Sequence, residues 1–246
     1  MGAVGLVLVR HGESIGNVAA AAADNAGADV IEVGMRDADV PLSATGVDQA
    51  KAWGASLGDT PVEARFDSVW CSPYRRALET ATLALQRAGL DLPVRVDERL
   101  RDRELGVLDL LTTKGVEARF PDEAIRRRWH GKFYHRPSGG ESWADVALRV
   151  RGVLADIDQW EQDRRVLIVC HDAVIMTIRY VCEGMSEGDV LATAKAEPLR
   201  NVSVTRLVRP SGQGWWKLQM HNDIAHLEQQ SATVTRHPGD PHVLPQ

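Results

Sequence analysis

The chain opens its first apolar run with Val4-Gly5-Leu6-Val7-Leu8-Val9 and continues without a break into Arg10-His11-Gly12-Glu13. A short apolar run rich in β-branched residues and bounded by polar ones predicts a buried β-strand. Two later runs repeat the pattern, Ser68-Val69-Trp70-Cys71 and Val166-Leu167-Ile168-Val169. Each of these runs ends abruptly in ionisable or small polar residues and then leads toward a helix.

Helical patterns alternate with these apolar runs along the chain. Val146, Val150, Val153, Ile157 and Trp160 are spaced by 3 or 4 residues, which predicts a helix. The alternation predicts an α/β fold: a three-layer α/β/α sandwich with a mostly parallel central sheet, helices on both faces and an irregular cap excursion. Two further strands are expected over 202–208 and 215–220, on either side of a turn.

The chain offers few signals that would divide it. We expect a single domain over residues 1–228, because no internal repeat and no glycine- or serine-rich linker interrupts it. Mixed signals over 107–140 indicate an excursion over the sheet. Residues 229–246 lose apolar periodicity and contain three prolines, so we expect them to form a mobile tail.

The charge of the chain limits its partners. Its 246 residues carry 29 Lys and Arg against 34 Asp and Glu, for a net charge of −5. That balance argues against wholesale nucleic-acid binding, because no excess of cations exists to neutralise phosphates. Five of the cations are Lys and 24 are Arg, and arginine holds phosphate or carboxylate with two donors at once. The composition is therefore compatible with a local anion site.

Targeting signals are weak. No apolar stretch reaches membrane-spanning length, so no membrane partner is expected. The three cysteines are widely spaced and form neither a disulfide framework nor a metal pattern. We therefore expect a cytoplasmic location.

Ionisable residues follow the three predicted strands at equivalent places: Arg10-His11, then Arg75-Arg76, then His171-Asp172. Ligands of open α/β sheets bind outside the carboxyl ends of the strands, so parallel neighbours would bring these side chains to one edge. Helix N-termini there would add backbone donors for an anion. Guanidinium and imidazole groups directed at one point indicate a phosphate site rather than a metal site. The spacing alone leaves a phosphoryl-transfer enzyme and a phosphate-binding module equally open.

Five ordered motifs run through the chain to about Leu227. They are Arg10-His11-Gly12-Glu13 with Asn17, Asp39-Val40-Pro41-Leu42-Ser43-Ala44-Thr45-Gly46 with Gln49-Ala50, Ser72-Pro73-Tyr74-Arg75-Arg76-Ala77 with Thr80-Ala81, Gly140-Glu141-Ser142 with Asp145 and Arg149, and Asn222-Asp223-Ile224-Ala225-His226-Leu227. Together they resemble the histidine phosphatase (phosphoglycerate mutase-like) superfamily. A lone Arg-His-Gly is a weak match, whereas five motifs in order are specific.

The resemblance implies a role for each matching residue. His11 would be the nucleophile that takes the phosphoryl group as a phosphohistidine, which water then hydrolyses. Arg10, Arg75 and His171 would surround the phosphate and stabilise charge on its oxygens. Asn17 would donate a further hydrogen bond to the phosphate. Neither a metal nor a cofactor is expected, because the guanidiniums supply the positive charge.

The general acid falls within the segment Leu100-Arg101-Asp102-Arg103-Glu104-Leu105-Gly106. The family pattern has its acid four residues before a glycine, which makes Asp102 the expected general acid where Glu is commoner. Asp is one methylene shorter, so geometry decides whether it reaches the leaving group. Glu104 is the alternative acid and a candidate substrate-binding residue, and an ordinary solvated charge run is the structural alternative. A second departure is Asp172, where the family usually has Gly.

Substrate choice is expected to lie in the excursion over 107–140. Its cations are candidates for binding a second anionic group of the substrate: Arg126, Arg127, Arg128, Lys132 and Arg136. Its aromatic residues could instead line an apolar or sugar-like pocket. A solvated helix face with aromatic residues packed beneath it explains the same pattern without a ligand. Glu141 is a further candidate substrate-binding residue.

The resemblance leaves a phosphatase and a phosphoglycerate mutase to choose between. A mutase must return the phosphoryl group to a second hydroxyl of the same small acid. The chain lacks the mutase-like run of prolines after the arginines, and it has Leu110 where mutases usually have glycine. We therefore expect a phosphomonoester hydrolase with a small phosphorylated substrate. A cofactor-dependent mutase and a non-catalytic phosphate-binding module are the alternatives, and the oligomeric state, including a homo-oligomer, stays open.

Overall fold

A single sheet forms the centre of the molecule. The computed structural model describes residues 1–58 and 65–237. Within them, six strands form the sheet in the order β3-β2-β4-β1-β5-β6. Their bounds are β1 (Gly5–Arg10), β2 (Ser68–Cys71), β3 (Val94–Val96), β4 (Arg165–Cys170), β5 (Val204–Val208) and β6 (Lys217–Asp223).

The strands that carry the ionisable residues are parallel neighbours. β4 pairs in parallel with β1 on one side and with β2 on the other. The carboxyl ends of all three therefore meet at one edge of the sheet, as expected from the sequence. β5 and β6 run antiparallel at the far edge, and the short edge strand β3 was not predicted.

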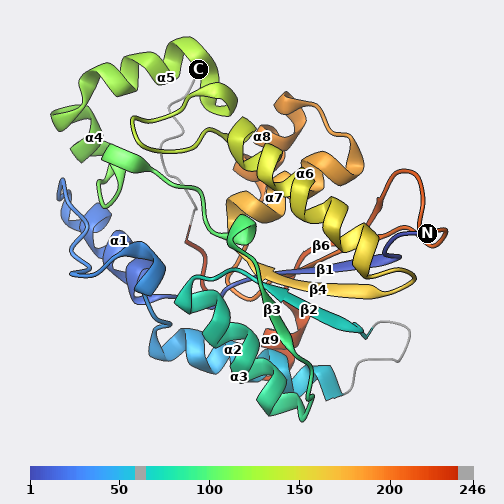
Figure 1. Cartoon of the computed structure of the whole chain (residues 1–246). Coiled ribbons are helices and arrows are strands. Elements are labelled where there is room, and N and C mark those ends of the chain that lie inside the picture. Colours follow the sequence, from blue (N-terminus) through green and yellow to red (C-terminus); the bar gives the residue numbers. More distant parts are fainter. Residues whose placement is uncertain (59–64, 238–246) are drawn as a thin grey trace.

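Helices cover both faces of the sheet (Figure 1). On one side lie α6 (Trp143–Trp160), α7 (Asp172–Glu183) and α8 (Glu187–Ala196). On the other lie α2 (Ala44–Gly58), α3 (Arg75–Ala88) and α9 (Ala225–Gln229). The sandwich of helices, sheet and helices confirms the predicted α/β/α fold.

Two apolar cores fill the spaces between the layers. Leu6 and Leu8 of β1 pack in the core under α6 and α7. Val7 and Val9 pack in the core over α2 and α3. Successive side chains of a strand point to opposite faces, so the unbroken apolar run of β1 supplies both cores. This is why the first strand carries no alternating polar positions.

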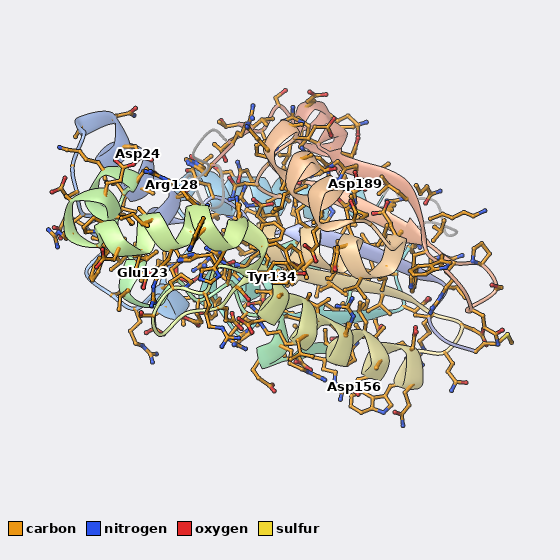
Figure 2. The ribbon with its side chains drawn as sticks, turned by 90° about the horizontal axis from the view of Figure 1, so that it is seen from above. Asp24, Glu123, Arg128, Tyr134, Asp156 and Asp189 are labelled. Atoms are coloured by element: carbon orange, nitrogen blue, oxygen red, sulfur yellow. The ribbon has the colours of Figure 1, made fainter. Side chains whose placement is uncertain are left out.

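The predicted excursion contains helices that extend beyond the carboxyl edge of the sheet (Figure 1). They are α4 (Thr113–Arg119) and α5 (Pro121–Tyr134). Pro121 occupies the first turn of α5, where a missing N–H costs no hydrogen bond. Glu123, Arg128 and Tyr134 mark the length of α5 in Figure 2. The helix α1 (Ile15–Ala26), which follows β1, lies on the same side of the molecule.

The described part of the predicted tail makes specific contacts with the rest of the molecule. Through His237 the chain is held to the body by hydrogen bonds from Gln49 and Asn201 and by a contact of His237 with Glu13. Composition alone does not reveal such contacts, because they depend on which polar groups the fold leaves nearby. Residues 238–246 lie outside the described residues. Among the helices that are described, none has the length and apolarity to cross a membrane.

Candidate active site

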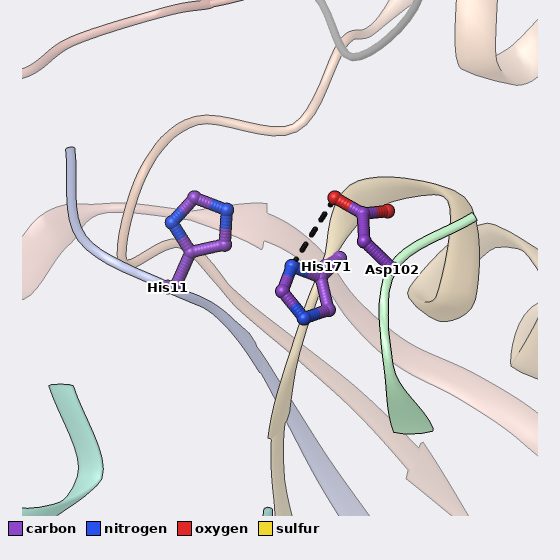
Figure 3. A group of neighbouring side chains, drawn as sticks. All are labelled: His11, Asp102 and His171. Atoms are coloured by element: carbon purple, nitrogen blue, oxygen red, sulfur yellow. Dashed lines mark ion pairs between the residues drawn. The ribbon is translucent and has the colours of Figure 1, made fainter. Parts of the chain in front are cut away.

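Two histidines and an aspartate come together at the carboxyl edge of the sheet (Figure 3). His11 follows β1 directly, and His171 follows β4 and is the N-cap residue of α7. Their ring centroids are 5.1 Å apart. Asp102 comes from the loop after the short helix η3 (Glu98–Leu100), and its Oδ2 lies 3.3 Å from Nδ1 of His171.

Close backbone packing fixes the loop that carries His11. The N–H of His11 donates to the carbonyl of Cys170 on β4 at 3.0 Å. The first turn of α2 then packs directly on the loop at Gly46. A Cβ atom on Gly46 would lie 2.0 Å from the carbonyl oxygen of Glu13, so only glycine permits this approach. The second motif is therefore present in the sequence because it supports the first.

One ring nitrogen of His11 is hydrogen-bonded to the backbone, and the other has no hydrogen bond to a described residue. Its Nδ1 lies 2.7 Å from the carbonyl oxygen of Gly12, and a carbonyl oxygen only accepts, so Nδ1 must carry the proton. Burial, together with the neighbouring Arg76, His171 and Arg10, lowers the pKa of His11 well below 6.5. The neutral ring therefore has its lone pair on Nε2, which is the form required of a nucleophile.

His171 is held on both sides of its ring. Its Nε2 lies 2.8 Å from Oγ of Ser72, and that oxygen also accepts the backbone N–H of Tyr74. Nδ1 faces the Asp102 carboxylate, which only accepts, so the proton of a neutral ring lies on Nδ1 and the Ser72 hydroxyl donates to Nε2. Burial lowers the pKa of His171, although Asp102 acts to raise it. The Tyr74 ring meets His171 edge-on, with centroids 5.2 Å apart.

Asp102 is an ionised carboxylate in the unliganded protein. Burial acts to raise its pKa, but His171, Arg76 and His11 outweigh burial and hold the pKa well below its usual range. The side chain is 30% exposed, whereas its partner His171 is fully buried. Asp102 is therefore the member of the group that is open to a ligand and to solvent.

Arg76, and not the expected Arg75, is the arginine of the second strand that reaches the site. Arg76 is buried and donates to Asp102 at 3.2 Å and to both carboxylate oxygens of Asp37. The Arg75 side chain is 58% exposed and pairs with Glu79 one helical turn further on. The two residues open α3, where successive side chains point in different directions. The expectation for Arg75 is therefore corrected to Arg76.

Arg10 contributes the second guanidinium. It is 2% exposed, and its Nη1 donates to the carbonyl of Leu199. Its Nε has no hydrogen-bond partner among the described residues. Burial lowers the pKa of Arg10, while Asp172 and Asp102 act in the opposite direction. A buried donor without a partner is costly, and an anionic ligand would satisfy it.

Asn17 lies in the first turn of α1, six residues after His11. Its side-chain oxygen accepts the N–H of Ser14, and the Ser14 hydroxyl accepts the N–H of Asn17, forming a capping box at the start of α1. Because the oxygen is occupied by this cap, the amide NH₂ is the part of Asn17 available to a ligand.

A cavity of about 690 Å³ opens beside this group, and His171, which is fully buried, is not among its lining residues. His11, Arg10, Arg76, Asp102, Asn17 and Glu104 all belong to its wall. Further cations around it are Arg103, Lys132, Lys195 and Arg236. α1 and the loops beyond it contribute both apolar residues (Ala20, Ala21, Ile31, Val33, Leu110 and Leu111) and polar ones (Asp24, Asn25 and Asp109) to the wall. The cavity therefore combines an anion site with a partly apolar wall.

Several residues expected to bind substrate lie elsewhere. Arg126, Arg127, Arg136 and Glu141 are not among the described residues that line the cavity. Arg126 is exposed on α5, and Arg127 faces a small separate pocket beside Val116. Arg136 pairs with Asp145 at the start of α6. The arginine run of α5 is thus outside the cavity, and Lys132 is the cation of this helix that lines it.

Glu141 supports the loop that carries Asp102, a role that the sequence did not reveal. Its carboxylate accepts from Arg101 and from Arg149 of α6, and it also accepts the backbone N–H of Glu104. Arg149 in turn donates to the carbonyl of Asp102 at 3.1 Å. Glu141 and Arg149 therefore fix the loop that carries Asp102. Their occurrence in one motif was the signal available for this pairing.

Glu104 lines the cavity, but its carboxylate already accepts a hydrogen bond from a neighbouring side chain. Its Oε1 accepts the hydroxyl of Tyr74 at 2.7 Å. Burial, together with Glu104, raises the pKa of Tyr74, so the phenol stays protonated and continues to donate. Asp102 has the more direct approach to both histidines, which favours it over Glu104 as a proton donor.

The chemistry of the group favours an anion over a cation. The candidate ligand atoms of His11, Asp102 and His171 lie within 4.8 Å of one another, which is a spacing that a metal ion could use. Arg76 already neutralises Asp102, and Arg10 lies in the same cavity wall. A metal ion would have to compete with Arg76 for the Asp102 carboxylate, whereas a phosphate would be attracted by Arg10 in the same wall.

Comparison with known proteins identifies the class. A model of the histidine phosphatase superfamily (branch 1) matches residues 6–224, and the chain belongs to this superfamily. A 2,3-bisphosphoglycerate-dependent phosphoglycerate mutase of Methylobacterium radiotolerans is 31% identical over 188 residues, covering 75% of this chain and 82% of the relative. A glucosyl-3-phosphoglycerate phosphatase of Mycobacterium tuberculosis is 33% identical over 182 residues, covering 70% and 72%.

Solved structures agree with this assignment. The native structure of a mycobacterial glucosyl-3-phosphoglycerate phosphatase superposes with a TM-score of 0.70 at 29% identity, covering 90% of this chain and 99% of that one. A putative α-ribazole-5′-phosphate phosphatase from Escherichia coli, at 21% identity and a TM-score of 0.71, covers 90% of this chain and 97% of its own and shares the fold. The relatives therefore include both phosphatases and mutases.

Proposed function

We propose that this chain is a phosphomonoester hydrolase that works through a phosphohistidine on His11. The observation that carries the proposal is the state of the His11 ring. Nδ1 donates to the Gly12 carbonyl at 2.7 Å, and burial lowers the pKa of the ring, so the lone pair stays on Nε2. Arg10 and Arg76 lie in the same cavity wall, ready to neutralise a phosphoryl group.

The reaction needs two displacements at phosphorus. In the first, Nε2 of His11 forms a bond to phosphorus while the ester P–O bond breaks, and Asp102 gives its proton to the leaving alkoxide. In the second, water attacks the phosphohistidine, Asp102 takes a proton from that water, and phosphate leaves. Arg10 and Arg76 stabilise charge on the phosphoryl oxygens in both steps, and His171 positions the Asp102 carboxyl group through its Nδ1.

Asp102 must be protonated before the first step. Its pKa is well below the usual range in the free protein, because His171 and Arg76 are close. A bound phosphate group brings negative charge into the cavity and partly neutralises these cations. Nearby negative charge raises the pKa of a carboxyl group, so substrate binding itself favours the protonated form of Asp102.

The size of the cavity bears on the size of the substrate. A volume of about 690 Å³ lies within the range of about 300–1,000 Å³ that is typical of sites for drug-sized ligands. This space would accommodate a phosphomonoester larger than a three-carbon phospho-acid. The mutase names among the relatives keep the transfer reaction as the second candidate.

The first experiment compares His11→Ala with the wild type in phosphate release from p-nitrophenyl phosphate. We expect the variant to lose about a thousandfold or more in kcat/KM. His130→Ala, which changes an exposed histidine of α5, is the matched control and should keep full activity. Rapid quenching of the wild type should trap a phosphohistidine that is labile to acid. Equal activity of His11→Ala and the wild type would rule out the proposed mechanism.

A second comparison identifies the general acid. Asp102→Asn and Glu104→Gln are each tested on p-nitrophenyl phosphate, which has a good leaving group, and on an alkyl phosphate, which has a poor one. An acid matters most when the leaving group is basic, so Asp102→Asn should lose more activity on the alkyl ester. Glu104→Gln should affect both esters alike. The reverse pattern would transfer the role to Glu104.

A third assay separates phosphatase from mutase. 3-Phosphoglycerate is supplied with and without its bisphosphate, and the products are resolved as free phosphate or as 2-phosphoglycerate. A hydrolase that accepts 3-phosphoglycerate releases phosphate in both mixtures. Bisphosphate-dependent formation of 2-phosphoglycerate would establish the mutase instead, and binding of phosphate without turnover of this or any other ester would leave the non-catalytic module.

A further inference from the structure

A segment near the end of the described chain, far from His11 in the sequence, is hydrogen-bonded to the candidate active site. We name residues 233–237 the C-terminal strap. Gln49 of α2 donates from Nε2 to the carbonyl of Thr233 at 2.9 Å and to the hydroxyl of Thr235 at 2.8 Å. Beyond Thr235, the strap contributes Arg236 and His237 to the cavity wall.

The direction of every hydrogen bond in this chain of contacts is determined. The Oε1 atom of Gln49 accepts the backbone N–H of Glu13 at 2.9 Å, so Nε2 is the end that faces the strap. The Thr235 hydroxyl accepts from that Nε2 and therefore donates its own proton onward, to Oδ1 of Asn201 at 3.0 Å. Two backbone groups fix the orientation of the Gln49 amide: the N–H of Glu13 can only donate, and the carbonyl of Thr233 can only accept.

Asn201 connects Thr235 to the loop that carries His11. Its Oδ1 is occupied by Thr235, so its Nδ2 faces the catalytic loop. There it donates to the carbonyl of His11 at 3.1 Å and approaches Oδ1 of Asn17 at 3.5 Å. Asn201 is fully buried, so water does not replace these contacts. The Asn17 oxygen thus accepts from both Ser14 and Asn201, and its NH₂ is turned toward the cavity.

We propose that Thr235 is a positioning residue, which acts through Asn201 to hold the Asn17 amide and the His11 backbone in the geometry that binds a phosphoryl group. This inference rests on the proposed function, because it assumes that Asn17 donates to the phosphate. Thr235 does not touch the substrate. A valine at this position keeps the shape of the side chain but leaves Gln49 and Asn201 without their shared partner, and the buried Oδ1 of Asn201 loses the donor that holds this end of the amide.

The test uses three variants of the full chain. Thr235→Val removes the hydroxyl, Thr235→Ser retains it, and Thr82→Val changes an exposed threonine of α3 as the matched control. We expect Thr235→Val to lower kcat/KM for p-nitrophenyl phosphate by about tenfold, the effect of a lost buried hydrogen-bond partner. Calorimetry should give weaker binding of inorganic phosphate by a similar factor. Thr235→Ser and Thr82→Val should stay within about twofold of the wild type.

Three outcomes would overturn the inference. One is phosphate binding by Thr235→Val equal to that of the wild type. Another is a Thr235→Ser protein as defective as Thr235→Val, since that would mean the methyl group matters and the hydroxyl does not. The third is full additivity of Thr235→Val with Asn17→Ala, because residues that act through one another are not additive.

Phosphate binding keeps this test separate from that of the proposed function. A wild-type protein that releases no phosphate from any ester would overturn the hydrolase. The effect of Thr235→Val on phosphate binding would still decide whether the strap positions the site.

Discussion

Arg76 holds two carboxylates at once from the first turn of α3. It donates to Asp37 through both terminal nitrogens and to Asp102 through one. The neighbouring Arg75 pairs with Glu79 at the surface. A buried, hydrogen-bonded guanidinium is expected to matter far more than an exposed ion pair, because solvent screens the exposed pair.

Substitution of the two arginines separates their contributions. Arg76→Gln should lower kcat/KM for phosphomonoesters by about a hundredfold or more, as expected for loss of a group that stabilises the transition-state charge. Arg75→Gln should stay within about twofold. Steady-state kinetics of both variants on p-nitrophenyl phosphate makes the comparison. A larger loss in Arg75→Gln would restore Arg75 to the site.

The pH profile should report the state of His11. The pKa of His11 is held well below 6.5 by burial and by the neighbouring Arg76, His171 and Arg10. The ring gains its nucleophilic form as the pH rises through that pKa, so this form is already complete at pH 6.5. We therefore expect the acid limb of kcat/KM to lie well below pH 6.5, once the substrate's own ionisation near about pH 6 is taken into account.

A different pH profile would contradict the predicted protonation state of His11. An enzyme limb centred at or above pH 6.5 would mean that His11 is protonated in the free protein. The nucleophile would then have to be generated after the substrate binds. A profile measured on two esters with different phosphate pKa values distinguishes the enzyme limb from the substrate limb.

Among the elements, those with continuous apolar sequence were predictable. β1, β2 and β4 were expected because their cores are unbroken runs, and their parallel alignment follows from the shared edge at which the polar residues appear. β3 was missed because it is a three-residue edge strand, Val94–Val96, with a charged residue at its centre. The two helices of the excursion were obscured because they hold few buried side chains.

Side-chain direction was harder to predict than position. His11, His171, Arg10 and Asp102 were placed correctly at one edge, because each follows a strand or a recognisable motif. Arg75 was chosen over Arg76 although the motif has its arginine directly before an alanine, which is Ala77 here. Helical geometry separates adjacent side chains by about 100°, and only the start of α3 decides which of the two faces the cavity.

The start of α6 provides a test at the scale of an element. Ser142 and Asp145 form a capping box there, and Arg136 also donates to Asp145. We expect Ser142→Ala to lower the free energy of unfolding by about 1 kcal/mol at pH 7. Chemical denaturation of the variant and the wild type gives this difference. No measurable loss would mean that α6 is stabilised by its buried face alone.

Asp145 should make that stability depend on pH. Burial acts to raise its pKa, but Arg136 and Ser142 outweigh burial and lower it to about 2. An unfolded aspartate titrates near about 3.9, so the stabilising effect is complete above that pH and is lost as the pH falls toward 2. Asp145→Asn should therefore be less stable than the wild type at pH 7, and the difference should shrink in acid. A constant difference would exclude this linkage.

At the scale of the whole molecule, a negative net charge coexists with cations placed beside the nucleophile. The chain carries −5 overall, and the cavity wall holds both Lys or Arg residues and acidic residues, with Arg10 and Arg76 in the same wall as His11. Of the 24 arginines in the sequence, Arg10 and Arg76 are the two that we assign to phosphoryl binding. The net charge therefore opposes polyanions at the surface while the cavity attracts a small one.

Inorganic phosphate or vanadate should accordingly stabilise the folded protein. A ligand that binds only the folded state at 100 times its Kd adds about 2.7 kcal/mol. For a chain of this size that amounts to a rise in Tm of about 5–10 °C. Thermal denaturation with phosphate is compared with chloride at equal ionic strength. The shift should disappear in Arg76→Gln, and a shift of the same size with chloride would indicate a general salt effect.

The contact between His237 and Glu13 has a consequence for how the protein matures. It joins residues 224 positions apart in the sequence, and contacts of such long range form late because closing a long loop costs entropy. During synthesis, the strap that supports the His11 loop emerges more than 200 residues after His11. Refolding should therefore recover helical circular dichroism before it recovers phosphate binding, and a nascent chain should stay inactive until the strap has been translated.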